Sequence, residues 1–291
     1  LTRSDDRNNE RSHLIMGFVD LLKERAKKSI KTIVLPETED MRTIEATDKI
    51  LKEGVAKIIL IGNEEEINKK AAEGGFDISG ATIVDPETSD RTQAYIDKFV
   101  ELRAKKGMTP EKAKEILHTQ YPYYGVMMVK MGDADGMVSG ACHSTADTLR
   151  PCLQILKTKP GTKLVSAFFL MVVPNCDMGA NGTFIFADAG LEQNPDPEKL
   201  ANIAISSADS FKLLVEKEPV VAMLSHSTKG SAKHADVDKV VEATKIAQEL
   251  APELALDGEL QLDAAIVPSV GESKAPGSKV AGHANVLVFP D

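Results

Sequence analysis

The stretch Gly136-Met-Val-Ser-Gly-Ala-Cys-His-Ser-Thr-Ala-Asp-Thr-Leu-Arg150, followed by Pro151, combines the local patterns of a strand, a turn and a helix. Its first four residues are mostly apolar and predict a strand, and the small and hydroxyl-bearing residues behind them predict a turn. Leucines then recur at helical spacing: Leu149, Leu153 and Leu156. A strand that leads through a polar turn into a helix is the repeating unit of α/β proteins.

The same alternation extends in both directions along the chain. We expect helices from Phe18 onward and over 42–53, 65–72, 93–106, 110–118, 123–131, 197–215 and 237–250. We expect strands over 32–35, 57–61, 81–84, 136–139, 164–173, 183–187, 220–224, 255–260 and 285–289. The longest apolar run, Leu164–Val173, suits a buried strand, and the acidic run Glu37–Asp40 suits a helix start. These patterns predict mainly parallel sheets with helices on both faces.

Length and turn signals predict two domains. A chain of 291 residues is long for a single core, and the turn cluster Lys159–Thr162 is the best candidate for a crossing between domains. We therefore expect a first α/β domain over 16–159 and a second over 160–291. Residues 1–15 are expected to be a polar tail or an expression remnant outside the fold.

Composition disfavours several classes of protein. The net charge is −9, there is no Trp and aromatic residues make up 4%, so neither a broad basic surface nor a base-stacking platform for nucleic acid is expected. No apolar run is long enough to span a bilayer and no secretory signal is present, which predicts a cytoplasmic protein without a membrane partner. The three cysteines form no disulfide framework.

Familiar cofactor and catalytic motifs are missing as well. We find no Gly-x-Gly-x-x-Gly turn, no Gly-x-x-x-x-Gly-Lys-Ser/Thr loop and no Gly-x-Ser-x-Gly elbow, which disfavours NAD, ATP and hydrolase chemistry. The six histidines make no His-x-x-x-His pair, so no metal site is predicted.

The turn after Gly136–Ser139 is the first candidate site. Its backbone N–H groups, the hydroxyls of Ser144 and Thr145 and the positive end of the following helix can address one anion, and Arg150 adds a formal charge. Ser139 and Thr148 are further substrate-binding candidates in the same stretch. Alternatively, the hydroxyls merely cap the helix and Arg150 is a surface charge. Cys142 has no evident activating base and is not a candidate nucleophile.

A second polar turn, with Ser227, Thr228 and Lys229, follows the expected strand 220–224 and is a possible loop at a ligand cleft. Its alternative is an ordinary loop between a strand and a helix. By itself, Arg103 is predicted to be a solvated charge on a helix.

Several motifs, taken together, resemble the phosphotransacetylase family. The main one is Val138-Ser-Gly-Ala-Cys-His-Ser-Thr-Ala-Asp-Thr-Leu-Arg-Pro151. The others follow the family's order: Leu35-Pro-Glu-Thr-Glu-Asp40, Ser227-Thr-Lys-Gly-Ser-Ala232, Leu250-Ala-Pro-Glu253, Asp257-Gly-Glu-Leu-Gln261, Asp263-Ala-Ala-Ile-Val267 and Lys274-Ala-Pro-Gly-Ser278. The resemblance covers the chain from about Met16 to Asp291.

This resemblance implies a fold and an activity. The expected fold is a pair of α/β/α domains related to isocitrate and isopropylmalate dehydrogenases, in a homodimer with the active site between the domains. The expected reaction moves an acetyl group reversibly between acetyl phosphate and coenzyme A, giving acetyl-CoA and phosphate, with no bound cofactor. By position, Arg103 and Arg150 match the family's phosphate-handling arginines, and Ser144 and Thr145 match its phosphate-contacting hydroxyls. Cys176 matches a cysteine near the active site that is not the nucleophile.

The sequence also departs from the family. The family continues beyond the strand that matches 285–289 into an Asp-Leu-Ser-Arg motif and a downstream aspartate, and neither is present here. In the family, these residues supply a serine, a further arginine and the proposed base for the thiol. Three alternatives therefore stay open: a phosphate butyryltransferase, a decarboxylating dehydrogenase of related fold, and an inactive truncated fragment or binding module.

Overall fold

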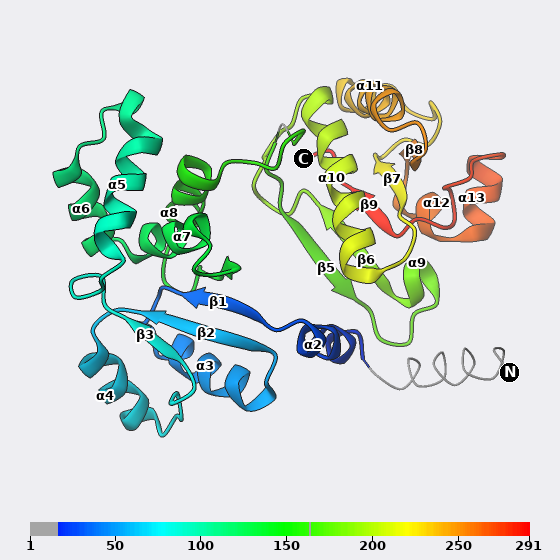
Figure 1. Cartoon of the computed structure of the whole chain (residues 1–291). Helices are drawn as coiled ribbons and strands as arrows, with labels where there is room; N and C mark the ends of the chain where they lie inside the picture. Colours follow the sequence, from blue (N-terminus) through cyan, green and yellow to red (C-terminus); the bar gives the residue numbers. More distant parts are fainter. Residues whose placement is uncertain (1–16, 163) are drawn as a thin grey trace, which may run out of the picture. The chain divides into compact units, whose positions relative to one another are not determined.

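The computed structural model describes residues 17–162 and 164–291, which divide into two compact units (Figure 1). The first unit ends at Lys157 and the second runs from Thr158 to Asp291. The sequence placed this division after Lys159. The expected tail, residues 1–15, lies outside the described residues.

The first unit is built on a four-stranded parallel sheet in the order β3-β2-β1-β4. Its strands are β1 (Lys31–Leu35), β2 (Ala56–Ile61), β3 (Thr82–Val84) and β4 (Gly136–Met137). Because β2 and β4 lie on opposite sides of β1, the direction of winding reverses between β1 and β4. Ligands of open α/β sheets bind at the carboxyl ends of the strands beside such a reversal. The segments that follow β1 and β4 are therefore the place to look for a site.

Helices cover both faces of this sheet, as the alternating pattern predicted. The connecting helices are α3 (Met41–Glu53), α4 (Glu64–Gly74), α5 (Thr92–Arg103), α6 (Pro110–Thr119) and α7 (Tyr121–Met131). Neighbouring strand residues point to opposite faces, so Val34 packs with α5, α6 and α7 while Leu35 packs with α3 and α4. Gly125 lets α7 approach the sheet closely, because a Cβ there would lie 2.7 Å from the sulfur of Met137.

Most boundaries in this unit agree with the sequence to within two residues. The acidic run is different: helix α3 begins at Met41, and only Asp40 acts as its N-cap by accepting a hydrogen bond from the Arg42 N–H. Glu37 lies outside the first turn, so its expected role at a helix start is wrong. A short helix α2 (Phe18–Lys28) precedes β1.

The second unit holds a mixed five-stranded sheet in the order β5-β6-β9-β7-β8. Its strands are β5 (Phe168–Val172), β6 (Thr183–Ala187), β7 (Val220–Leu224), β8 (Ala255–Leu260) and β9 (Val286–Val288). All pairings are parallel except that of β5 with β6. The helices are α9 (Met178–Asn181), α10 (Pro197–Val215), α11 (Ala235–Leu250), α12 (Leu262–Ile266) and α13 (Pro268–Lys274). One face packs on α10 and α11, the other on α12 and α13.

The expectation of a buried strand over 164–173 is wrong. Only Phe168–Val172 forms a strand, at the antiparallel edge of the sheet, and the exposed fractions of Phe169 and Val172 are 60% and 47%. Phe168 and Leu170 pack against the core, whereas the alternate side chains face away from it. A continuous apolar run is typical of a strand covered on both faces, but here the residues described cover one face only.

Mainly parallel sheets and α/β architecture are thus confirmed. Within the described residues, no helix combines the length and the apolar character that crossing a bilayer requires. Kinship with the isocitrate dehydrogenase fold stays a prediction.

Candidate active site

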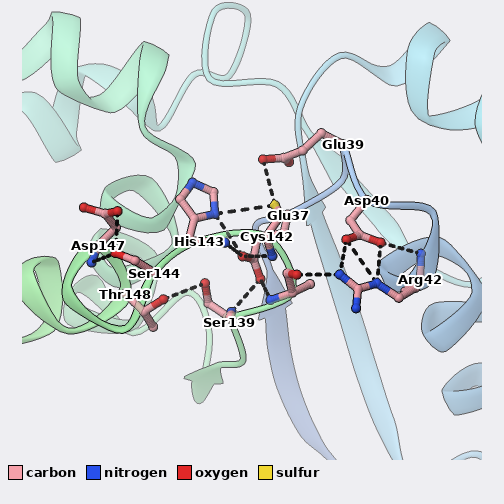
Figure 2. Close-up of polar contacts among 12 residues, drawn as sticks. Glu37, Glu39, Asp40, Arg42, Ser139, Cys142, His143, Ser144, Asp147 and Thr148 are labelled. Atoms are coloured by element: carbon pink, nitrogen blue, oxygen red, sulfur yellow. Dashed lines mark hydrogen bonds and ion pairs between the residues drawn. The ribbon is translucent and has the colours of Figure 1, made fainter. Parts of the chain in front are cut away.

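The loop between β4 and helix α8 (Thr145–Pro151) is folded around the carboxylate of Glu37, which follows β1 (Figure 2). Two backbone N–H groups donate to Oε2, from Gly140 at 2.7 Å and Ala141 at 2.8 Å. Two more donate to Oε1, from Cys142 at 2.9 Å and His143 at 2.8 Å. The Nδ1 atom of His143 also lies 2.9 Å from Oε1. Glu37 is only 2% exposed, so the protein itself supplies the anion in this turn.

This finding corrects one part of the sequence-based site. The turn was expected to hold free backbone N–H groups for a ligand, but those of residues 140–143 donate to Glu37. A phosphate must therefore find its donors elsewhere in the stretch. No local pattern indicated the contact, because Glu37 lies about a hundred residues earlier and meets the loop only through the pairing of β1 with β4.

Hydrogen bonding decides the protonation of Glu37. Burial alone would raise the pKa of this carboxyl, but the N–H donors from Cys142, Ala141 and His143 and the His143 ring outweigh it and hold the pKa well below its ordinary value of 4.5. The carboxylate is therefore charged across the physiological range.

We expect the contribution of Glu37 to stability to depend on pH with a definite sign. Its pKa is lower in the folded state than in the unfolded chain, so its stabilisation is complete above about pH 5 and is lost as the pH falls through 4.5 toward the depressed folded value. Urea unfolding of the wild type and Glu37→Gln should give midpoints whose separation is constant from about pH 7 to 5 and narrows below that. A separation that widened on acidification would contradict this assignment.

Cys142 is not a nucleophile in this arrangement. Its thiol donates to Glu39 Oε1 at 3.3 Å. Desolvation, that hydrogen bond and the charges of Glu39 and Glu37 raise the pKa of the Cys142 thiol to about 12. The thiolate, which is the reactive form, is therefore disfavoured at neutral pH.

Glu37, Cys142 and His143 also offer one ligand atom each within 4.8 Å of one another, a grouping that histidine spacing did not indicate. The two oxygens of Glu37 already accept N–H donors, and the Cys142 thiol retains its proton. This hydrogen bonding favours a filled carboxylate nest over a set of metal ligands. The prediction that the protein binds no metal stays a prediction.

Ser144 is the N-cap of α8, the alternative that the sequence left open. Its Oγ accepts from the Asp147 N–H at 3.2 Å and donates to Asp147 Oδ2 at 2.6 Å. Arg150 Nη1 donates to Asp147 Oδ1 at 3.0 Å, and the Arg150 side chain is half exposed. Ser139 Oγ lies 3.4 Å from Thr148 Oγ1, and Thr145 is exposed. Helix α8 and the loop before it therefore carry four hydroxyls and an arginine.

Arg103 and Arg150 share a neighbour, Tyr123 on α7. Burial raises the pKa of Tyr123, and the positive charges of Arg150 and Arg103 both act against that rise. Arg103 is the last residue of α5, and its Nε is buried without a hydrogen-bond partner among the residues that the structure describes. The fold thus brings the two arginines to one region. No local pattern pointed to Tyr123, whose spacing is that of a core residue.

A pocket of about 330 Å³ lies beside the Glu37 loop, at the carboxyl ends of β1 and β2. Its charged and titratable lining residues are Glu39, Glu66, Lys70, His118 and His143. Both carboxylates and basic groups thus line the pocket. Lys70 already donates to the backbone oxygen of Thr38. The pocket lacks the excess of positive charge that a phosphate needs. The arginines beside Tyr123 meet that requirement better.

In the second unit, the polar loop after β7 uses its hydroxyls internally. Ser227 is fully buried and donates to Glu259 Oε1 at 2.9 Å, and Thr228 is 5% exposed and donates to Gln261 Oε1 at 3.3 Å. Lys229 is exposed and pairs with Asp257. Cys176, in the segment before α9, is half buried. That Ser227, Thr228 and Lys229 form a loop at a ligand cleft, and that Cys176 lies near the active site without being its nucleophile, stay predictions.

The fold is that of an α/β protein whose candidate site follows the carboxyl ends of its strands. Residues 17–291 match the family model described as Phosphate acetyl/butaryl transferase, and the chain belongs to this family. It is 58% identical over 276 residues to the phosphate acetyltransferase of Acetivibrio thermocellus, covering 95% of this chain and 82% of that protein. The Bacillus subtilis phosphate acetyltransferase is 47% identical, with coverage of 94% and 81%.

Solved structures agree with this assignment. The EutD phosphotransacetylase from Staphylococcus aureus matches with a TM-score of 0.86 at 43% identity, covering 94% of this chain and 82% of that one. A phosphotransacetylase from Streptococcus pyogenes gives 0.86 at 45% identity, with coverage of 94% and 81%. A branched-chain phosphotransacylase from Enterococcus faecalis, with a TM-score of 0.61 at 17% identity, shares the fold. The resemblance inferred from the motifs is confirmed.

Proposed function

We propose that this protein reversibly transfers an acetyl group between acetyl phosphate and the thiol of coenzyme A. The observation that carries the proposal is the 58% identity, over 95% of the chain, to a protein named phosphate acetyltransferase. The thiolate sulfur bonds to the acetyl carbonyl carbon, and the bond from that carbon to the phosphate oxygen breaks. Phosphate leaves with the electron pair, so neither a bound cofactor nor a covalent enzyme intermediate is needed.

Positive charge is the first requirement of this reaction, because both substrates are anions and the chain carries a net charge of −9. In the proposal, Arg150 and Arg103 hold the phosphate by charge-assisted hydrogen bonds. Their common neighbour Tyr123 supports this pairing. The exposed Ser144 and Thr145 serve the remaining phosphate oxygens, with Ser139 and Thr148 beside them. Developing charge on the departing phosphate then meets donors that are already in place.

The proposal includes a cytoplasmic homodimer, as the resemblance implies. Strand β5 supports the dimer: Phe169, Met171 and Val172 are exposed apolar side chains at a sheet edge, and a second subunit is one way to cover such a patch.

The test is an assay of the purified chain with acetyl phosphate and coenzyme A. We expect acetyl-CoA and phosphate to form in equal amounts, without NAD, and butyryl phosphate to react more slowly. A faster reaction with butyryl phosphate would identify a phosphate butyryltransferase instead. Reduction of NAD in the presence of a divalent metal would support the decarboxylating dehydrogenase instead. If neither reaction occurred, the alternative of an inactive fragment or binding module would be supported.

A further inference from the structure

We infer that Glu37 is a positioning residue for the reaction, an internal anion that fixes the loop from which the phosphate-binding helix α8 starts. This inference rests on the proposed function. Glu37 is 2% exposed and accepts from four consecutive backbone N–H groups, at distances between 2.7 and 2.9 Å. It touches no group assigned to the substrate and acts through the loop.

The loop cannot keep this shape without an acceptor. The four N–H groups point at the two oxygens of the Glu37 carboxylate. Gly140 adopts a φ of +119°, a conformation that side-chain-bearing residues rarely adopt. Converging N–H groups form a concave anion site, and buried donors left without an acceptor are costly. A glutamine of the same size would present an amide NH₂ to two of these donors. Charge and two oxygens are therefore both needed.

The loop connects Glu37 to the groups proposed to bind phosphate. It begins at Ser139, whose hydroxyl lies 3.4 Å from that of Thr148, and it ends at Ser144, the N-cap of α8. A second anchor comes from Arg42, which donates to the Ala141 carbonyl oxygen at 2.5 Å while paired with Asp40. Displacement of residues 140–143 must move Ser144 and the first turn of α8, and small misplacements of binding groups can cost about a hundredfold in rate.

If the Glu37 side chain is removed, the N–H groups of residues 140–143 should accept a free carboxylate in its place. We therefore propose Glu37→Ala, assayed for acetyl-CoA formation with and without formate. We expect turnover to fall about 10- to 50-fold, and millimolar formate to restore it severalfold with saturation. Formamide has the same shape without the charge and should restore nothing. Glu39→Ala is the matched control: it removes a neighbouring carboxylate that accepts a hydrogen bond from the Cys142 thiol, and it should show neither the loss nor a response to formate.

Unchanged turnover in Glu37→Ala would overturn the inference. So would a loss of turnover that formate leaves untouched in a variant whose circular dichroism matches that of the wild type, because a carboxylate returned to the loop would then not restore the reaction. If Glu37→Ala does not fold, Glu37→Gln takes its place, with an expected loss of turnover in a variant that still folds, although at a lower midpoint. Normal turnover in that variant would equally overturn the inference.

The failure of the proposed function is distinguishable from the failure of this inference. A wild type without acetyl transfer removes the proposed function. The loop is then tested by amide hydrogen exchange: the N–H groups of residues 140–143 should be protected in the wild type and exchange faster in Glu37→Ala, with protection regained in formate. Exchange in the wild type as fast as in an unfolded chain would overturn the positioning role by itself.

Discussion

Replacing Arg150 by alanine should lower the rate of acetyl-CoA formation from acetyl phosphate by about 10²- to 10³-fold, the scale for one preorganised donor at a developing charge. Arg150 is the one formal positive charge on α8, and its exposed guanidinium donates to Asp147, on the same helix, at 3.0 Å. If it binds the phosphate that leaves, its loss should reduce kcat as well as kcat/KM for acetyl phosphate. Steady-state kinetics at saturating coenzyme A measures both.

The stability of this variant should hardly change, because a half-exposed ion pair between neighbouring turns of a helix contributes little. The control is Lys98→Ala, which removes a similar pair with Glu101 on α5 and should leave both rate and unfolding midpoint near the wild-type values. Near-normal turnover in Arg150→Ala would return Arg150 to the alternative reading of a surface charge. A drop matched by Lys98→Ala would show a general effect of surface charge.

Much of the fold could be predicted because its information is local. Strands such as Val220–Leu224 are apolar throughout and helices such as Pro197–Val215 follow a helical spacing, so both were found at their true bounds. The run Leu164–Val173 misled because hydrophobicity reports what a side chain prefers and not which neighbour covers it. Helices α12 and α13 were missed because each is shorter than two turns and shows no full period.

The site divides in the same way. Ser144 as a helix cap and the turn around Cys142 follow from local chemistry. The acceptor of that turn, Glu37, does not follow from local chemistry, because the order of the strands brings it to the loop. The influence of Arg103 and Arg150 on Tyr123 likewise depends on the packing of α5, α7 and α8. Such contacts between distant segments leave no periodic trace in one sequence.

Each unit uses a buried carboxylate to hold a loop at the carboxyl end of its sheet. In the first unit Glu37 accepts the N–H groups of residues 140–143. In the second, Glu259 of β8 is 3% exposed and accepts from the Ser227 hydroxyl at 2.9 Å and the Gly230 N–H at 2.7 Å. A charged acceptor makes stronger hydrogen bonds than a neutral one. Polar residues in these loops are therefore divided between those that hold the loop and those left for a ligand.

In our proposal Arg103, at the end of α5, is also held for a ligand, and replacing it by methionine should separate activity from stability. Its Nε is buried without a hydrogen-bond partner in the described part of the chain, so a long apolar side chain should leave the unfolding midpoint unchanged or higher. Loss of a phosphate-binding guanidinium should lower kcat/KM for acetyl phosphate by about a hundredfold or more.

Arg91→Met, at the other end of α5, is the reciprocal control. Arg91 pairs with Asp133 at 2.7 Å and lies over the Tyr95 ring, contacts that serve the fold. It should therefore lower the midpoint slightly and keep its turnover. Thermal unfolding and steady-state kinetics on both variants decide the matter. A guanidinium held for a ligand leaves a buried donor unsatisfied in the empty protein, so its removal should not cost stability. If Arg103→Met instead lost stability and kept its activity, Arg103 would be a structural residue. The phosphate site would then have to be built around Arg150 alone.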